Sequence, residues 1–559
     1  MPPSSSSSAR TTTHTRAGIE FFNPAAFWIG TTMTVVGVLL HLRDFASAAD
    51  MGYVMVGMPM TRWMLAGMVL IIGGLILATI GLHPFRVSPK GVVRGTVQEY
   101  HFRAMDDARL TPAHWGLLFV LGVALIIDVM KPATLAFVMP GTKAEYGLTT
   151  SELALLPLIA LTGTTIGSVI WGYLADRIGR RASILLASVM FIGTSICGFM
   201  PSYSWNLFMC FVMGLSAGGM LPIVYALMAE SVPAHKRGWL VVLHGGMGTV
   251  GGYMAASGFA ALLEPIFTWR ILWFLGLPTG LLMLLLNRWI PESPRYLLER
   301  GREDEARAVM ARYGIALEQT ETPITPESTA QTKKRLGGLI RLFRQPYSAR
   351  TFTVVMYGLG WGLVNWGFLT FLPTFLSDAG YGRSSASGLL FLSSIISIPG
   401  TIVVAWLYGM WSSKRTMILY AALTALTMVG FAFLDPDPTR ANPTILTILL
   451  VSLFVASGGV ISMLSPYTAE VYPTALRGSG SGLAAGSSKL GGILGPPVIA
   501  SLMAISPGLA LPALASAAPI ALSAMVLAWL GVETRGRRLE DISSATVPGA
   551  PSDPGPGVL

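Results

Sequence analysis

Fourteen apolar stretches, each about long enough to cross a lipid bilayer, run through the sequence. A membrane helix needs roughly 20 mainly apolar residues to span about 30 Å of hydrocarbon. Charged residues make up 12% of the chain, whereas soluble domains carry about a quarter, so buried helices of a soluble protein are the weaker explanation. The stretches are Ala25–Leu42, Thr61–His83, 113–139, 152–174, 181–201, 205–229, 238–263, 269–290, 349–376, 384–410, 414–434, 442–468, 475–503 and 506–531.

The positive charge alternates from one predicted loop to the next. If both termini are cytoplasmic, the cytoplasmic loops hold Arg86, Lys90, Arg94, Arg103, Arg109, Arg177, Arg180, Arg181, Lys236, Arg237, Lys414, Arg415, Arg535, Arg537 and Arg538. The opposite loops hold Arg43, Arg62, Lys143, Arg270, Arg383 and Arg440. Cytoplasmic loops are enriched in Lys and Arg. The sequence therefore predicts a multi-pass protein of the cytoplasmic membrane with both termini inside, and the net charge of +10 reflects topology rather than nucleic-acid binding.

Several classes of chemistry lack their sequence signals. The two cysteines, Cys197 and Cys210, both fall in predicted membrane helices and suffice for neither a disulfide framework nor a four-ligand metal site. No phosphate-binding G-x-x-x-x-G-K-[ST] motif is present, so ATP hydrolysis does not drive this protein. No set of His, Asp or Cys gathers at one depth and no nucleophilic serine motif stands out. We therefore expect no enzyme, no cofactor and no metal.

Two motif pairs repeat with one period. The pattern E-x-x-P-x-x-x-R-G occurs at Glu230–Gly238 and at Glu470–Gly478, a spacing of 240 residues (470 minus 230). The pair Glu292-Ser293 recurs as Glu533-Thr534, a spacing of 241 residues (533 minus 292). Repeats of this length predict two similar six-helix halves, related as parallel repeats by an axis along the membrane normal.

Two short motifs lie between the predicted helices: GYLADRIGRR at Gly172–Arg181 and PESPRYLLERG at Pro291–Gly301. The first resembles the loop signature of the major facilitator superfamily, a large class of secondary transporters. The second narrows the resemblance toward the sugar-porter and metabolite:proton symporter branch. The resemblance covers about 113–541. It implies an all-α membrane protein that works by alternating access, with a functional monomer; the oligomeric state is left open.

The first two apolar stretches depart from the twelve-helix pattern of that family and predict an extra transmembrane hairpin, giving fourteen helices in total. A basic connector and a linker with short helices complete the organisation. The expected divisions are a disordered cytoplasmic N-terminus (1–24), the hairpin (25–83), the connector (84–112), the N-terminal bundle (113–290), the cytoplasmic linker (291–348), the C-terminal bundle (349–531) and the cytoplasmic tail (532–559).

Charged residues at the helix ends predict a cytoplasmic gate. The resemblance implies that Asp176 caps or pairs at the start of a neighbouring helix, and that Arg177 and Arg181 pair with Glu230. The repeat extends the gate to the second half, where the turn near Gly409–Arg415 keeps its bases but lacks the acid. The full set is Gly172, Asp176, Arg177, Gly179, Arg180, Arg181, Glu230, Arg237, Glu292, Arg295, Glu470 and Arg477.

Three titratable residues inside the hydrocarbon are candidates for proton coupling, because buried charges are costly and need a reason. Asp128 and Lys131 lie at i,i+3 on the first core helix, share a face and could pair. Asp128 would act as a protonation switch; a self-neutralising pair is the alternative. His244 lies in the fifth core helix, where a packing role is the alternative to carrying a proton.

Four further side chains are candidates for the substrate site. Lys489, midway along the eleventh core helix, could hold an anionic group or pair with an acid. Trp361, Asn365 and Trp366 in the seventh core helix offer flat rings and a two-way hydrogen-bonding amide. Packing or interfacial positions are the alternative for the two tryptophans.

The sequence thus predicts a secondary active transporter of a small organic solute, and we favour proton-coupled symport of an organic acid or similar metabolite. Its partners are the substrate, protons and the bilayer. Sugar:proton symport and efflux of a drug-like solute remain open, and a transporter-like sensor is the alternative outside transport.

Overall fold

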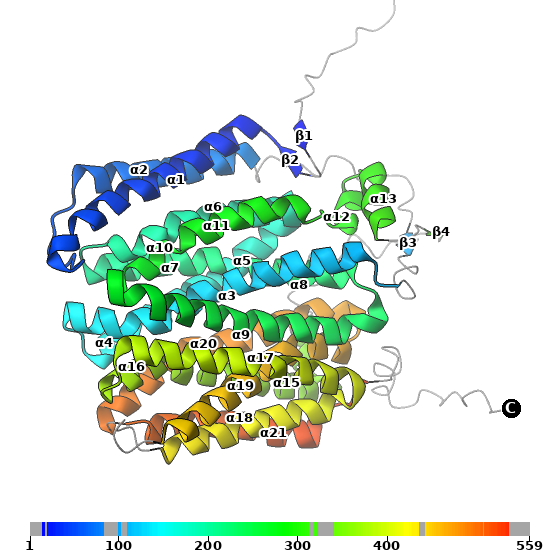
Figure 1. Ribbon diagram of the computed structural model, residues 1–559. Coiled ribbons are helices and arrows are strands. Elements are labelled where there is room, and N and C mark those ends of the chain that lie inside the picture. The colour runs from blue at the N-terminus through cyan, green and yellow to red at the C-terminus, as the bar shows by residue number, and fades with distance from the viewer. Residues whose placement is uncertain are drawn as a thin grey trace, which may run out of the picture.

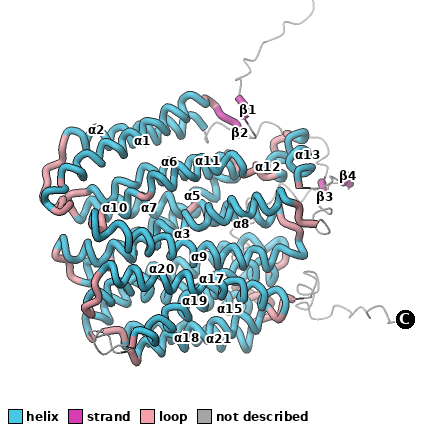
Figure 2. The backbone as a smooth tube through the Cα atoms, in the orientation of Figure 1, coloured by secondary structure: helices cyan, strands magenta, loops and turns pink. Residues whose placement is uncertain are grey.

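The computed structural model describes residues 14–16, 19–82, 99–101, 109–313, 318–320, 340–434, 442–506 and 508–535. These residues form a bundle of long helices lying side by side, with helix ends gathered at two opposite ends of the bundle (Figure 1). We name the ends by their short helices, the α12–α13 end and the α4–α10 end. The tube in Figure 2 shows that helix dominates and that most loops lie at the two ends.

The first part of the chain contains β1 (His14–Arg16), β2 (Ile19–Phe21), α1 (Pro24–Ser47), η1 (Ala49–Met51), α2 (Arg62–Leu82), β3 (Glu99–His101), α3 (Pro112–Tyr146), α4 (Thr150–Leu153), α5 (Leu155–Ile178), α6 (Arg180–Gly193), η3 (Thr194–Phe199), α7 (Tyr203–Ala217), α8 (Met220–Ser231), α9 (Ala234–Phe267), α10 (Ile271–Phe274), α11 (Gly276–Leu286) and η4 (Asn287–Trp289). The rest contains α12 (Pro294–Glu299), α13 (Glu303–Arg312), β4 (Glu318–Thr320), α15 (Ser348–Gly362), the π-helix η6 (Leu363–Leu369), α16 (Thr370–Asp378), α17 (Arg383–Met410), α18 (Ser413–Ala432), α19 (Pro443–Val471), α20 (Thr474–Ile505) and α21 (Ala510–Leu530). The strands pair antiparallel as β1–β2 and β3–β4.

Thirteen helical segments among the described residues are long and apolar enough to cross a membrane. The stretch predicted at 205–229 is missing from this set because its helix is divided into α7 and α8 at Gly218 and Gly219. A side chain at Gly218 would collide with the backbone of Thr164 on α5, and one at Gly219 with the ring of Trp171. Close packing against α5 therefore requires the two glycines, and glycine inside a helix weakens it.

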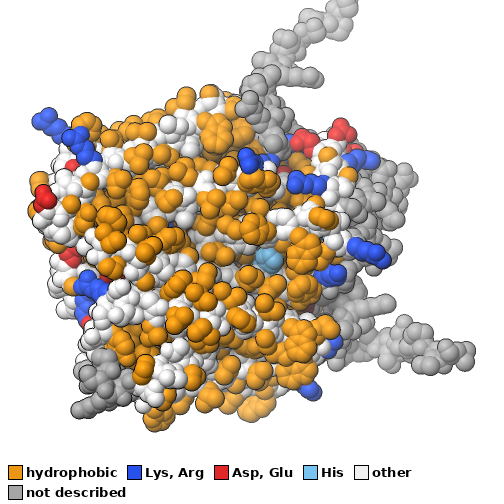
Figure 3. Space-filling view, in the orientation of Figure 1, with side chains coloured by type: hydrophobic (Ala, Val, Ile, Leu, Met, Phe, Trp, Pro, Cys, Tyr) orange, Lys and Arg blue, Asp and Glu red, His pale blue; other side chains and the backbone are white. Residues whose placement is uncertain are grey.

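The bundle carries a broad apolar surface between its two ends, while Lys, Arg, Asp and Glu gather toward the ends (Figure 3). Large side chains on this surface are strongly exposed: Phe119 is 71% exposed, Val169 73% and Leu426 67%. A water-soluble protein rarely leaves so continuous an apolar surface uncovered. The expectation of a helical membrane protein is therefore confirmed.

Helices α1 and α2 pack against each other through glycines. A side chain on Gly74 would approach the backbone oxygen of Gly30 to 2.5 Å, and one on Gly37 would approach that of Gly67 to 2.6 Å. The glycines of α2 recur at Gly67, Gly74 and Gly81, every seven residues, which places them on one helix face. The resulting flat seam lets the two backbones come close.

This α1–α2 pair lies on the side of the bundle formed by α6 and η3 (Figure 1). A side chain at Gly193 of α6 would lie 3.1 Å from Ile71, and the rings of Phe45 and Phe199 stand 5.1 Å apart between centroids. The pair therefore extends the first six-helix half.

The two halves meet mainly along four helix pairs: α9 with α17, α9 with α19, α5 with α20, and α3 with α16. At the α4–α10 end they are also joined by polar contacts. Lys143 on α3 forms an ion pair with Asp378 on α16 at 2.7 Å, and the hydroxyl of Ser384 donates to the backbone oxygen of Ala261 at 3.3 Å. This end of the interface is closed in the observed conformation.

The short helices α12 and α13 lie within the predicted linker and cover the end of the first half (Figure 1). Residues 1–13, most of the connector, 321–339 of the linker and 536–559 of the tail lie outside the described residues. The divisions predicted there remain expectations from the sequence.

Candidate functional site

Lys489 joins the two halves in the middle of the bundle. From α20 in the second half, its Nζ donates to the backbone oxygen of Thr164 on α5 at 3.2 Å and to the hydroxyl of Ser168. Both acceptors belong to the first half. The Lys489 ammonium is therefore the charged group of these two hydrogen bonds, and both of its acceptors are uncharged oxygens.

Asp128 faces the same region from α3. Its side chain is 4% exposed and lies close enough to Lys489 and to Tyr225 on α8 to interact electrostatically with both. A side chain at Gly245 would come within 2.8 Å of the Tyr225 hydroxyl, so this tyrosine also reaches α9. Three helices of the first half and one of the second thus place an acid, a phenol and an ammonium together. Sequence reasoning missed Tyr225, the single tyrosine of α8.

Lys131 does not pair with Asp128, which corrects the predicted i,i+3 contact. Its Nζ donates to the backbone oxygen of Phe191 at 2.7 Å and to the hydroxyl of Thr194 at 2.6 Å, and it lies 3.8 Å from the centroid of the Phe191 ring. These residues end α6, whose last carbonyls lack helical partners and carry partial negative charge. Lys131 on α3 therefore places a positive charge at the C-terminus of α6, and its hydrogen bonds stay within the first half.

His244 links α9 to α3. Its Nδ1 lies 2.9 Å from the backbone oxygen of Leu240 and its Nε2 3.0 Å from that of Leu118. A neutral imidazole has a single N–H, so both contacts can be hydrogen bonds only when the ring is protonated. A neutral ring can donate to one of these two oxygens at a time, and His244 packs between α9 and α3.

The seventh core helix contains a π-helix at the predicted substrate residues. Segment η6 includes Asn365 and Trp366, and π-helical turns often occur at functional sites. Asn365 is 2% exposed, and its side-chain amide makes no hydrogen bond to another described residue. Trp361 donates from Nε1 to the backbone oxygen of Ser457 at 3.0 Å, which fixes its ring against α19. Trp366 contacts α20, where a side chain at Gly492 would lie 2.8 Å from the indole.

The turn between α5 and α6 is built around Gly179 and Glu292. Gly179 has a φ of +94°, a conformation that favours glycine, and a side chain there would also collide with the Glu292 carboxylate. That carboxylate accepts from the backbone N–H groups of Arg180 at 2.8 Å and Arg181 at 3.1 Å. Glu292 therefore caps the start of α6 from 112 residues away in the chain, and a negative charge suits a helix N-terminus. At Gly172 a side chain would meet no atom within 4 Å.

The charged residues of the same turn make local contacts. Asp176 pairs with Arg180, the first residue of α6, at 3.5 Å. Arg177 lies over the ring of Tyr173 at 4.7 Å, and its backbone oxygen accepts from the Tyr296 hydroxyl at 3.3 Å. Arg181 donates from Nε to the backbone and side-chain oxygens of Asn287, both at 3.1 Å. The side chains of Glu230, Arg237 and Arg295 lie outside the described residues, so the pairs predicted with Glu230 stay predictions.

The second half repeats this cap with different chemistry. Glu533 accepts from the backbone N–H of Ser413 at 3.0 Å and from the hydroxyls of Ser412 and Ser413, at the start of α18. Serine hydroxyls thus supply part of this cap, whereas the cap on α6 is made by the backbone N–H groups of Arg180 and Arg181. Although burial raises the pKa of Glu533, the hydrogen bonds from Ser412 and Ser413 outweigh it and hold that pKa below its ordinary value.

Glu470 stands next to this second cap. It accepts from Tyr408 on α17 at 2.9 Å and from Thr534 at 2.6 Å, so it joins α19 to α17 and to the segment that follows α21. Arg477, on α20, lies near enough to Glu470 for their charges to interact. A side chain at Gly238 of α9 would come within 3.3 Å of Glu470, so this cluster borders the first half.

The Glu292 cap gives a pH-dependent prediction. Burial raises the pKa of Glu292 to about 6, against the lowering effect of the backbone hydrogen bonds. The folded state therefore binds this proton more tightly than the unfolded state does, and stability is lost as pH rises from about 4.5 to about 6. Relative to Glu292→Gln, the free energy of unfolding of the wild type should fall by about 2 kcal/mol over that range. Unfolding in mild detergent at pH 4.5 and 7 measures it; a constant difference between the two proteins would contradict the prediction.

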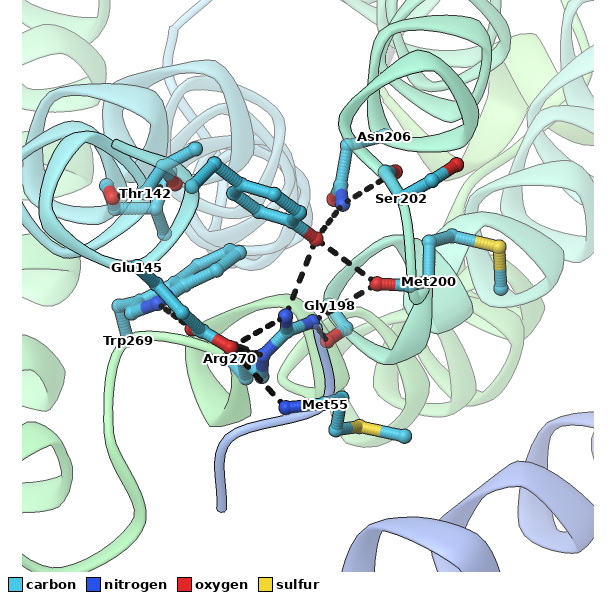
Figure 4. Close-up of polar contacts among 11 residues, drawn as sticks. Met55, Thr142, Glu145, Gly198, Met200, Ser202, Asn206, Trp269 and Arg270 are labelled. Carbon is cyan, nitrogen blue, oxygen red and sulfur yellow. Dashed lines mark hydrogen bonds and ion pairs between the residues drawn. The ribbon is translucent and has the colours of Figure 1, made fainter. Parts of the chain in front are cut away.

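A buried ion pair that the sequence reasoning missed lies at the α4–α10 end (Figure 4). Arg270 is fully buried and binds the Glu145 carboxylate through Nε and Nη2, with the shortest contact at 2.8 Å. Trp269 also donates to Glu145 at 2.8 Å, and Tyr146 lies beside the guanidinium. The backbone N–H of Met55, between α1 and α2, donates to Glu145 at 3.1 Å. One carboxylate thus holds α3, the start of α10 and the α1–α2 loop together. In the sequence, the signal for this ion pair was the presence of Glu145 and Arg270 at the ends of two apolar stretches.

A helical membrane bundle with two repeated halves, a central ammonium at their interface and capped turns at one end has the architecture of an alternating-access transporter. Residues 117–496 match the family model of the Major Facilitator Superfamily, and the chain belongs to that family. It is a secondary transporter of a small organic solute and not an enzyme.

Relatives and a solved structure agree with this assignment. The chain is 29% identical over 438 residues to the niacin transporter NiaP of Acinetobacter baylyi, which covers 77% of this chain and 96% of NiaP. It is 25% identical over 419 residues to the benzoate transport protein of the same organism, covering 72% and 86%. The fold is similar to that of the proton:xylose symporter XylE from E. coli, with a TM-score of 0.58, 20% identity, and coverage of 78% and 99%.

Proposed function

We propose that this protein takes up a small aromatic or similar organic carboxylate, together with protons, across the cytoplasmic membrane. The observation that carries the proposal is the Lys489 ammonium, which lies between the halves beside Asp128. An ammonium held by uncharged oxygens can exchange them for a carboxylate at little cost. Niacin and benzoate, which appear in the names of two relatives, are both aromatic carboxylates.

The arrangement offers a route to coupling. While Asp128 is ionised, it attracts the Lys489 ammonium and competes with a substrate anion. When Asp128 takes up a proton, that competition ends and the ammonium can bind the substrate carboxylate. Proton and anion then favour each other's binding, and such linkage is reciprocal. We assign Asp128 the coupling role, Lys489 the substrate anion, and Asn365 with Trp366 the rest of the substrate; His244 is a second candidate for the proton.

Alternating access needs a lock that opens and closes. We propose that the α12–α13 end is cytoplasmic, as its arginines favour, and that the caps made by Glu292 and Glu533 hold the turns of that gate. Both termini would then be cytoplasmic. We further propose that α7 and α8 together form one crossing, which brings the total to fourteen, with α1 and α2 as an additional membrane hairpin.

Sugar:proton symport is the second candidate, and the PESPR motif at Pro291–Arg295 favours it. That motif lies at the end of the bundle, however, and not among the residues near Lys489. A sugar has no charged group to pair with the Lys489 ammonium, whereas a carboxylate does. We therefore rank the carboxylate first.

The test is transport by the purified protein in liposomes under a pH gradient, with labelled niacin, benzoate, xylose and an organic cation. We expect the two acids to accumulate and the sugar and the cation not to. Lys489→Met should raise the KM for the acids by at least about tenfold, because a charge-assisted hydrogen bond contributes about 1.5–3 kcal/mol.

Lys236→Met is the matched control, because this lysine lies at the start of α9, away from the halves' centre. It should transport the acids like the wild type. Accumulation of xylose alone would replace the proposal with its second candidate, and an unchanged KM in Lys489→Met would remove that lysine from the substrate site.

A further inference from the structure

Tyr253, on α9, carries a buried hydroxyl without a hydrogen-bond partner. The residue is 2% exposed, and its oxygen makes no hydrogen bond within the part of the chain that the structure describes. Phenylalanine would fill the same space without leaving a polar atom unpaired. Buried polar groups are nearly always paired, so an orphaned hydroxyl at an interface calls for an explanation.

The hydroxyl faces the second half of the protein. The ring of Tyr253 lies 5.7 Å from that of Phe454 on α19, measured between centroids. The hydroxyl of Thr370 lies near it, and donates to the backbone oxygen of Asn365 at 3.2 Å. The orphaned hydroxyl is thus next to the segment of the π-helix that presents the unpaired Asn365 amide.

Tyr253 and Lys489 are linked through the same segment of the second half, which runs from α15 through η6 to Thr370. Phe454 is three residues, about one helical turn, from Ser457, which accepts from Trp361. On the other side of the same helix pair, α20 meets α15 and η6 where Gly491 and Gly492 contact Leu359 and Trp366. Lys489 precedes these glycines by less than one turn. The α15–η6 segment therefore contacts the stretch of α20 that contains Lys489 and, through the neighbouring Thr370, the side of α9 that contains Tyr253.

We propose that Tyr253 is a specificity-determining residue that hydrogen-bonds a polar atom of the substrate's aromatic ring. The proposal rests on the function proposed above, in which Lys489 holds the carboxylate. The preferred substrate is then an aromatic acid with a ring nitrogen or a ring hydroxyl, such as niacin or 4-hydroxybenzoate, over unsubstituted benzoate. A tyrosine hydroxyl can donate to a pyridine nitrogen and accept from a phenol, so one residue serves both.

The test compares kcat/KM for niacin and for benzoate in liposomes, for the wild type and for Tyr253→Phe, which removes one oxygen atom. We expect the wild type to prefer niacin. In the variant, kcat/KM for niacin divided by kcat/KM for benzoate should fall by about threefold to tenfold, the effect of losing one neutral hydrogen bond. Tyr357→Phe is the matched control. Its hydroxyl is also buried and unpaired within the described residues, but it points toward Tyr467 at the α12–α13 end.

Competition against labelled niacin in the wild type gives a second measurement that needs no variant: 4-hydroxybenzoate should compete more strongly than benzoate. An unchanged ratio in Tyr253→Phe, or an equal loss in Tyr357→Phe, would overturn the inference while leaving acid transport intact. If the wild type carries neither acid, the proposed function and this inference both fail.

Discussion

Asp128→Asn is expected to abolish the accumulation of substrate driven by a pH gradient, while exchange of labelled for unlabelled substrate continues. With one proton carried per substrate, a gradient of two pH units can support about hundredfold accumulation, because each unit is worth about 1.4 kcal/mol. Asparagine cannot take up the proton, so the gradient no longer acts on the carrier. The measurement is the steady-state concentration ratio in liposomes, together with the exchange rate at equal pH.

The control for this prediction is Asp44→Asn. Asp44 is also a buried acid in a membrane helix, 6% exposed, but it lies on α1 and accepts from the Thr61 hydroxyl at 2.8 Å. Its variant should accumulate substrate normally. Full accumulation by Asp128→Asn would remove Asp128 as the coupling residue, and His244 would then be the next acid–base group to test.

Arg270→Met should destabilise the protein by about 3–5 kcal/mol, the usual cost of removing one partner from a buried ion pair. The guanidinium is fully buried and also donates to the backbone oxygens of Gly198 at 2.7 Å and Met200 at 3.0 Å. Its loss leaves the Glu145 carboxylate and both carbonyls without their cation. The effect can be measured by denaturant unfolding in detergent micelles.

Lys143→Met provides the comparison at the same end of the bundle. The Lys143–Asp378 pair is just as short, at 2.7 Å, but the two side chains are 25% and 46% exposed. Exposed pairs contribute about 0–1 kcal/mol. A loss in Lys143→Met as large as that in Arg270→Met would show that burial does not set the difference.

The Glu145 network also gives the α1–α2 pair a role in the first half. Whether this hairpin regulates, dimerises or only anchors the chain cannot be read from the sequence. Met55 donates to the carboxylate that also binds Arg270, and Gly193 meets Ile71 across the seam with α6. The pair is therefore bound both at its loop and along its length, so we expect it to move with the first half when the halves rock.

The helical membrane fold could be read from the sequence because hydrophobic length is a local property: about 20 apolar residues mark a span wherever they lie. The repeated motifs likewise indicated two halves, since Glu292 and Glu533 cap equivalent helices, α6 and α18. The break between α7 and α8 could not be read this way. It depends on how closely α5 approaches Gly218 and Gly219, which are glycines among many in this chain.

The site was only partly accessible from sequence. In the sequence, Lys131 and Lys489 look alike, as lone lysines inside apolar stretches. In the structure, Lys131 on α3 binds the C-terminal end of α6 within the first half, whereas Lys489 bridges both halves. Tyr225 and Tyr253 gave no signal of their own, because a tyrosine in a membrane helix is ordinary until its neighbours are known. Asp128 is buried, but Lys131, with which its spacing allowed a pair, contacts the end of α6 instead, and the coupling role of Asp128 stays a prediction.

The amino-acid sequence by itself determined that this protein lies in a lipid bilayer, that it is helical, that it contains a twofold repeat and that it belongs to a class of transporters. These follow from hydrophobicity and from spacing along the chain, which need no knowledge of neighbours. Only the tertiary structure decided which buried charges meet between the halves and which serve a single helix end. That choice depends on helix rotation and on close approach at glycines, both of which are set by packing between segments far apart in the chain.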